Sequence, residues 1–270
     1  MMDELSAERI REGLSTKVVG RELVYLPETG STQDEARRLA RAGAGDGLLV
    51  IADHQTSGRG RLQRQWVAPP GSSLLMSLLF RPALRPFQAQ RLTMICGLAA
   101  CDAVECQTGL QVALKWPNDV VIGGAKAGGI LTEIEVMGDR LAYGIVGIGL
   151  NVALDLPQLP KDLLMPATSL SAEAGRPVPR LPLLRDFLQA ADKRYLSLKA
   201  GHSPHIEWSQ RLATLGQRVT VSGSGDVIEG VAEGVDSDGA LLVRREGGGL
   251  ETVLAGDVTL RFGQTGANLL

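Results

Sequence analysis

Residues 111–152 constrain the fold most, because they contain three or four consecutive strand patterns with tight glycine turns between them. The strand patterns are QVALKW, DVVI, GGILTEIEV and LAYGIVGIGLNV, and the turns are Gly123-Gly124 and the sequence MGDR. Turns this short join antiparallel neighbours, whereas parallel neighbours need a long crossover. The segment therefore predicts an antiparallel stretch of sheet.

The segments before residue 111 add helices and further strands. Thr32 and Glu35 match a capping box at the start of a helix with the sequence QDEARRLARAG. Continuous apolar runs at residues 48–53 and 72–80 are typical of buried strands, and residues 87–106 predict a long helix that packs closely on a sheet. The expected fold class is α+β, with a mixed, mainly antiparallel sheet flanked by helices.

Three parts are expected along the chain. Residues 1–22 predict a short N-terminal helix and linker, and residues 23–214 predict the main domain. From about Gly216 the composition changes to short strands separated by Gly, Asp and Ser turns. This pattern is typical of a small β-barrel, so residues 215–270 are expected to form a small C-terminal β-barrel domain.

Composition limits the partners of the chain. Its 28 Lys and Arg residues against 30 Asp and Glu residues give a net charge of -2, so no general attraction to nucleic acid or to an anionic membrane is expected. No apolar run approaches the ~20 residues that cross a bilayer, and the start is too charged for a signal peptide, so we expect a cytoplasmic protein. The spacing of the Cys residues and the isolation of the His residues exclude a metal held by His or Cys.

The most unusual segment is QTSGRGRLQRQW at residues 55–66. Glycine lets backbone N–H groups approach a ligand, and Arg59, Arg61 and Arg64 offer forked donors, so this loop is suited to wrapping a small anion. Trp66 at the end of a polar loop needs an apolar surface to cover, such as a ligand ring. The alternative interpretation is a solvated basic surface loop.

A second segment combines the sequence KWPND at residues 115–119 with Lys126, and it contains two of only six lysines in the chain. A Lys is a compact point charge, and beside an arginine loop it would neutralise two anionic groups brought together for reaction. Asp119 would then take a hydrated Mg²⁺ that accompanies phosphates. The alternative is a simple Pro-Asn-Asp turn beside a solvated lysine.

Two further segments offer polar groups for a ligand. In GIGLN at residues 147–151 the glycines lie within a strand, where they often mark close approach by a ligand, and Asn151 offers a donor and an acceptor to an adenine edge. The alternative is a glycine-rich sheet packed against the long helix. Ser31 and Thr32 explain the start of a helix, and their hydroxyls also suit a polar ligand head group.

In this order and spacing the segments resemble the biotin protein ligases. The matching motifs are GSTQ at 30–33, QTSGRGRLQRQW at 55–66, KWPND at 115–119, KAGGILTE at 126–133 and GIGLN at 147–151. The C-terminal part resembles the small SH3-like domain of that family. Gln63 stands where many members carry Gly, and Gln33 stands where Asn is usual.

The resemblance implies two half-reactions. Biotin and MgATP would form biotinyl-5'-AMP and pyrophosphate, and a lysine of a biotin carboxyl carrier domain of acetyl-CoA carboxylase would then attack the adenylate. The residues implied to bind biotin are Ser31, Thr32, Gln33, Gln55, Gly58, Arg59, Gly60, Arg61, Lys126 and Gly129. Those implied to bind ATP or the adenylate are Arg61, Arg64, Trp66, Lys126 and Asn151. The catalytic residues would be Lys126, Arg61 and Arg59, with Asp119 serving Mg²⁺ or acyl transfer.

Three alternatives compete with this interpretation. A lipoate or octanoate ligase or transferase is similar in fold, but its usual paired arginines before a glycine run are absent. A biotin-sensing repressor needs an N-terminal DNA-binding domain, and fewer than 25 residues precede the first matched strand. A non-catalytic biotin sensor has no use for Lys126 or Asp119. The resemblance also allows a homodimer, in which a hairpin such as residues 129–149 pairs across a sheet edge.

Overall fold

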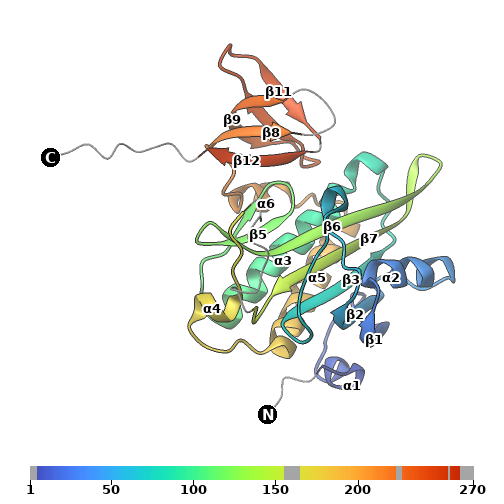
Figure 1. The fold of residues 1–270 in the computed structure, drawn as a ribbon. Helices are drawn as coiled ribbons and strands as arrows, with labels where there is room; N and C mark the ends of the chain where they lie inside the picture. Colours follow the sequence, from blue (N-terminus) through green and yellow to red (C-terminus); the bar gives the residue numbers. More distant parts are fainter. Residues whose placement is uncertain (1–4, 155–164, 223–226, 255, 262–270) are drawn as a thin grey trace.

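The computed structural model describes residues 5–154, 165–222, 227–254 and 256–261. Figure 1 shows a seven-stranded sheet with helices on both faces, and a five-stranded sheet near the C-terminus that lies at one end of it. Within the described residues, no helix combines the length and the apolar character needed to span a membrane.

The larger sheet is mixed, with the strand order β1-β2-β3-β7-β6-β5-β4. In that order the strands are β1 (Leu23–Thr29), β2 (Leu49–Gln55), β3 (Ser73–Phe80), β7 (Arg140–Asn151), β6 (Ala125–Met137), β5 (Asp119–Ile122) and β4 (Ala113–Lys115). The strands β1 and β2 pair in parallel because helix α2 (Thr32–Arg41) connects them as a crossover. The other neighbours pair antiparallel, so the mixed, mainly antiparallel sheet expected from the sequence is confirmed.

Alternation along β2 separates two apolar cores. Leu49 and Ile51 belong to the core that includes α3 (Gln90–Thr108) and α5 (Arg180–Lys199), whereas Val50 packs with α2. The remaining helices are short: α1 (Ala7–Arg11), α4 (Leu170–Ala174) and α6 (His205–Gln210), with single 3₁₀ turns at Arg61–Gln63 and Pro86–Gln88. Helices α3 and α5 cover one face of the sheet, whereas α2 covers only part of the other. A ligand site therefore has room at the ends of the strands or above the part of the sheet that α2 leaves open.

The capping box expected at the start of α2 is wrong. The N-cap is Ser31, and its side chain makes no capping hydrogen bond. The Thr32 hydroxyl, which lies 2.8 Å from the Ser77 hydroxyl, donates to the side-chain oxygen of Gln55 at 3.0 Å. Glu35 accepts hydrogen bonds from Arg38 instead of reaching back to the cap. A capping box requires the Thr32 hydroxyl to accept from a backbone N–H of the helix. Here the hydroxyl contacts Gln55 of β2 and Ser77 of β3 instead.

The second sheet is antiparallel throughout, with the order β11-β10-β9-β8-β12. Its strands are β8 (Arg218–Ser222), β9 (Ile228–Val235), β10 (Leu241–Arg244), β11 (Leu250–Val253) and β12 (Asp257–Arg261). Short strands with polar turns were expected here and are confirmed. In the described residues β11 and β12 stay at the two edges, so the pairing forms an open sheet and does not close into the expected barrel.

Trp116 joins the two sheets. Its indole N–H donates to the Gly239 carbonyl at 2.9 Å, and its backbone N–H donates to the Thr214 hydroxyl at 2.9 Å. The ring is 1% exposed, so it is part of the core between the sheets. An ion pair between Arg91 and Asp238 at 2.8 Å adds a second connection. These contacts hold the C-terminal sheet beside β4 and β5, next to the KWPND segment.

Candidate active site

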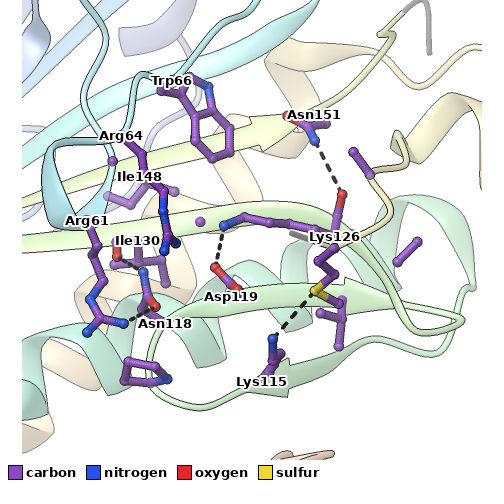
Figure 2. Close-up of a pocket in the computed structure, with 18 of the residues that line it drawn as sticks. Arg61, Arg64, Trp66, Lys115, Asn118, Asp119, Lys126, Ile130, Ile148 and Asn151 are labelled. Carbon is purple, nitrogen blue, oxygen red and sulfur yellow. Dashed lines mark hydrogen bonds and ion pairs between the residues drawn. The ribbon is translucent and has the colours of Figure 1, made fainter. Parts of the chain in front are cut away.

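A cavity of about 1440 Å³ opens above β6 and β7, and its lining includes the arginine loop and the start of β12. Figure 2 shows the loop side chains Arg61, Arg64 and Trp66 around it. Most residues that the sequence singled out line it: Thr32, Gln33, Gln55, Arg59, Gly60, Arg61, Arg64, Trp66, Asp119, Lys126, Gly129 and Asn151. Ser31 and Gly58 are buried beside the cavity and do not line it. The structure therefore brings segments from four separate parts of the chain to one place.

The start of α2 forms a polar end of the cavity. Gln55 accepts hydrogen bonds from the backbone N–H and the hydroxyl of Thr32, at 2.8 and 3.0 Å. The Gln33 amide donates to the Leu131 carbonyl at 3.0 Å. Each of these side chains has a fixed partner, so their remaining donors and acceptors point in set directions. Such an arrangement suits a small neutral polar group of a ligand better than a charged group.

The arginine loop is ordered by its own backbone. The Gly60 N–H donates to the Arg64 carbonyl at 2.7 Å, and the Trp66 N–H donates to the Gly58 carbonyl at 2.9 Å. A Cβ atom at Gly58 would lie 2.5 Å from the Trp66 carbonyl oxygen, so only glycine fits there. Leu62 sits at the tip with a positive φ of 53°. Glycine at this loop therefore serves the fold of the loop as well as ligand approach.

The three loop arginines point in two directions. Arg61 and Arg64 both reach Asp257 at the start of β12, and Arg61 also donates to the Gly256 carbonyl at 2.9 Å. Arg59 instead pairs with Asp34 of α2 at 2.8 Å. Arg61 and Arg64 therefore share one carboxylate of the protein and Arg59 contacts another, and the wrapping of a ligand anion by the loop stays a prediction. Burial lowers the pKa of Arg61, and the nearby carboxylate of Asp257 opposes that shift.

Lys126 occupies the centre of the cavity. Its ammonium group donates to the Asp119 carboxylate at 2.5 Å and lies 5.8 Å from the centroid of the Trp66 ring. Strand β4, on the far side of β5 from β6, contributes Lys115, whose ammonium group lies 3.9 Å from the Met165 sulfur. Burial lowers the pKa of Lys115, while Asp119 opposes the shift. Lys115 of the KWPND segment and Lys126 therefore both line the cavity and are not solvated edge charges.

The glycines of β7 divide between the two faces of the sheet. A Cβ atom at Gly149 would lie 2.6 Å from the Trp66 ring, and one at Gly147 would lie 2.8 Å from the Gln33 side chain. Only on the other face, at Gly144, would it meet the long helix, 2.5 Å from Leu92. Packing against the long helix therefore explains Gly144, whereas the glycines of the GIGLN segment make room on the cavity side.

Asn151 is fixed by its amide nitrogen. It donates to the Thr168 carbonyl at 3.1 Å and to the Lys126 carbonyl at 3.4 Å. The side-chain oxygen is buried and has no partner among the described residues. Because a buried oxygen without a donor is costly, this atom is suited to accept a hydrogen bond from a ligand.

Sequence reasoning gave no separate role to three groups at this site. Asn118 holds the loop and the floor together, since its oxygen accepts from Arg61 at 3.2 Å and its nitrogen donates to the Ile130 carbonyl at 2.7 Å. Lys115 was noted only as part of its motif, which is a usable signal. Asp257 carried no signal, because it lies 196 positions from Arg61 along the chain.

Two segments of the chain match known protein families. Residues 26–151 match the family described as Biotin/lipoate A/B protein ligase, and residues 214–261 match the biotin protein ligase C-terminal domain. A biotin–acetyl-CoA-carboxylase ligase of Mycobacterium tuberculosis is 35% identical over 88% of this chain and 88% of its own length. The chain belongs to the biotin protein ligase family. The bifunctional ligase/repressor BirA of Bacillus subtilis is 36% identical over 95% of this chain and 79% of its own length.

Solved structures of biotin protein ligases share the fold. The Aquifex aeolicus biotin protein ligase in complex with biotin and ATP superposes with a TM-score of 0.73, at 31% identity, over 89% of this chain and 99% of that one. The Leishmania major biotin protein ligase in complex with biotinyl-5-AMP gives 0.56 at 28% identity, over 86% and 98%. Among the described residues of the present chain, no three His, Cys, Asp or Glu side chains are grouped to hold a metal ion.

Proposed function

We propose that this protein activates biotin with MgATP to form biotinyl-5'-AMP and then transfers biotin to a lysine of a biotin carboxyl carrier domain of acetyl-CoA carboxylase. One observation carries the proposal. A polar end at α2 and a cationic centre at Lys126 share one cavity, which the Trp66 ring covers above a floor of glycines. A neutral polar head group fits the polar end at α2, and two reacting anions fit the cationic centre at Lys126.

In this proposal biotin lies with its head group at the α2 end. Thr32, Gln33 and Gln55 supply the directed hydrogen-bonding groups, and Ser31 and Gly58 support them from beside the cavity. Gly129 leaves space for the ligand beside Trp66, since a Cβ atom there would lie 3.0 Å from the ring. The biotin carboxylate then reaches toward Lys126.

The adenylation step requires two anions to meet. A carboxylate oxygen attacks the α-phosphorus of MgATP, the bond from that phosphorus to the bridging oxygen breaks, and pyrophosphate leaves with the electron pair. Fixed positive charge is most effective where negative charge builds in the transition state. Lys126 and Arg61 supply this positive charge, and Gly60 lets the loop backbone approach the phosphates. Arg59 acts in this proposal by holding the loop through Asp34, with Mg²⁺ arriving as part of the MgATP substrate.

The nucleotide base is assigned to the Asn151 side of the cavity. The free Asn151 oxygen accepts from an exocyclic amino group, and the Trp66 ring packs over the bound adenylate. Arg64 reaches toward the phosphates. In the second half-reaction Asp119 accepts a proton from the incoming carrier lysine; its contact with the Lys126 ammonium group supports this role.

The same proposal covers the larger organisation. We assign residues 23–214 to catalysis and residues 215–270 to an SH3-like C-terminal domain, whose strand order is given by the described pairs. A homodimer is proposed through the outer half of the β6–β7 hairpin, where Ile134, Val136 and Met137 are exposed. Sedimentation of the purified protein would show a monomer if the dimer proposal is wrong.

One experiment tests the function. The protein is incubated with MgATP and a carrier domain, with biotin, lipoate or octanoate as the acyl donor, and the carrier is analysed by mass spectrometry. We expect the mass of the carrier to increase when biotin is the acyl donor and not when lipoate or octanoate is. We expect no increase when the target lysine of the carrier is replaced by Met. Transfer of lipoate or octanoate, or binding of biotin without any transfer, would refute the proposal in favour of a lipoate ligase or a biotin sensor.

A further inference from the structure

The cations that line the cavity differ in whether a carboxylate neutralises them. Lys126 is paired with Asp119, whereas Arg61 and Arg64 share Asp257. Lys115 makes its contact with the Met165 sulfur, and no described carboxylate lies within 4 Å of its ammonium group. Among the cations that the structure describes around the cavity, Lys115 is therefore the one that can take up an anion without first leaving an ion pair.

The place of Lys115 in the fold is fixed by strand pairing. It lies directly opposite Asp119 in the β4–β5 register, and Figure 2 shows it on the side of Asp119 away from Trp66. Burial lowers the pKa of Lys115 and the Asp119 carboxylate raises it. The positive charges of Lys126 and Arg64 lower it further, and the Asp257 carboxylate opposes them. The Lys115 ammonium group therefore interacts electrostatically with members of both ion-paired groups, Lys126–Asp119 and the arginine pair with Asp257.

A half-buried ammonium group needs a partner. Removing a charge from water is unfavourable unless an opposite charge or strong acceptor replaces the lost hydration. A thioether sulfur is a weak acceptor and does not replace it. The position therefore favours a ligand that brings negative charge to this side of the cavity.

We propose that Lys115 binds the β- and γ-phosphates of MgATP and, after adenylation, the leaving pyrophosphate. This inference rests on the proposed function. In the proposed binding mode the nucleoside lies beside Trp66 and Asn151. Figure 2 shows Lys115 on the other side of Lys126, toward which the two leaving phosphates would extend. A lysine suits this role because it pairs with mobile phosphate oxygens as a point charge and needs no planar geometry.

A direct binding test does not depend on catalysis. Binding of inorganic tripolyphosphate is measured by calorimetry for the wild type, Lys115→Met, Lys115→Arg and a control, Lys193→Met, which removes an exposed lysine of α5. We expect Lys115→Met to weaken tripolyphosphate binding about tenfold or more, and the other two variants to stay within about threefold of the wild type. Equal affinity for Lys115→Met and the wild type would overturn the proposal.

A second measurement separates the leaving phosphates from the α-phosphate. Lys115→Met should raise the KM for ATP and weaken product inhibition by pyrophosphate, while its affinity for biotin and for preformed biotinyl-5'-AMP stays unchanged. Equal loss of affinity for ATP and for biotinyl-5'-AMP would place Lys115 at the α-phosphate and overturn the proposal. If the wild type failed to transfer biotin, the proposed function would fall, whereas the tripolyphosphate comparison would still decide the role of Lys115.

Discussion

Two glycines of β7 provide a matched pair of substitutions that test the role of Trp66. Gly149→Ala and Gly144→Ala add the same methyl group to the same strand, on opposite faces of the sheet. The added Cβ would lie 2.6 Å from the Trp66 ring in the first case and 2.5 Å from Leu92 in the second. Neither change alters a charge or a polar group, so differences between the two variants report only what is displaced.

The size of each effect follows from the packing. Carbon atoms in contact normally lie about 3.5 Å or more apart, so Trp66 must retreat by roughly 1 Å. It is half-buried above a cavity and can do so, and a misplacement of that size at a binding group costs up to about 100-fold in rate. Leu92 is fully buried, so Gly144→Ala should instead lower the free energy of unfolding by about 1–3 kcal/mol.

The assay is pyrophosphate release as a function of ATP at saturating biotin, together with urea unfolding of each variant. Gly149→Ala should reduce kcat/KM for ATP by about ten- to 100-fold with little loss of stability, and Gly144→Ala should do the reverse. Tryptophan fluorescence gives an independent check, because Trp116 and Trp208 are buried and only Trp66 should respond. Unchanged ATP kinetics in Gly149→Ala, or the same profile in both variants, would refute the reasoning.

The remaining predictions concern single groups. Arg61→Gly should still form the adenylate but release it, because the loop loses its hold on the phosphate; biotin would then appear on bystander proteins, and tight adenylate retention would contradict this. Lys126→Ala should reduce the adenylation rate by about 100-fold or more, and normal pyrophosphate release would disprove the bridging role. Cys106 is exposed, whereas burial raises the pKa of Cys101 to about 12 and that of Cys96 further. One thiol should therefore react with a disulfide reagent in the native protein and three after unfolding.

The sequence predicted the parts of this molecule that depend on local pattern. Alternating and continuous apolar runs gave the strands of the larger sheet, and Gly123-Gly124 gave a turn that the structure contains between β5 and β6. The loop with Arg61 and the strand with Lys126 were recognised as chemical segments because their residue types are unusual in such spacing. Local pattern is sufficient for these features because neighbours in sequence determine them.

Contacts between distant segments could not be predicted in the same way. The Thr32 hydroxyl was assigned to its own helix because a capping pattern is local and takes no account of Gln55, which lies 23 positions away along the chain. The pairing of Arg59 with Asp34 separates it from the other loop arginines, and only the packing of the loop beside α2 determines that choice. Closure of the C-terminal strands into a barrel likewise depends on edges that a strand pattern does not specify.

Asp257 gives the C-terminal sheet a share in the energetics of ligand binding. Arg61 and Arg64 both pair with this one carboxylate, so an anion that draws them into the cavity must compete with β12 for the same two guanidinium groups. Coupled equilibria are reciprocal, and the free energy by which the anion weakens the contact with β12 equals that by which the contact weakens anion binding. The affinity for an anionic substrate therefore depends on how strongly β12 holds the two arginines, although β12 lies far along the chain from the loop that carries them.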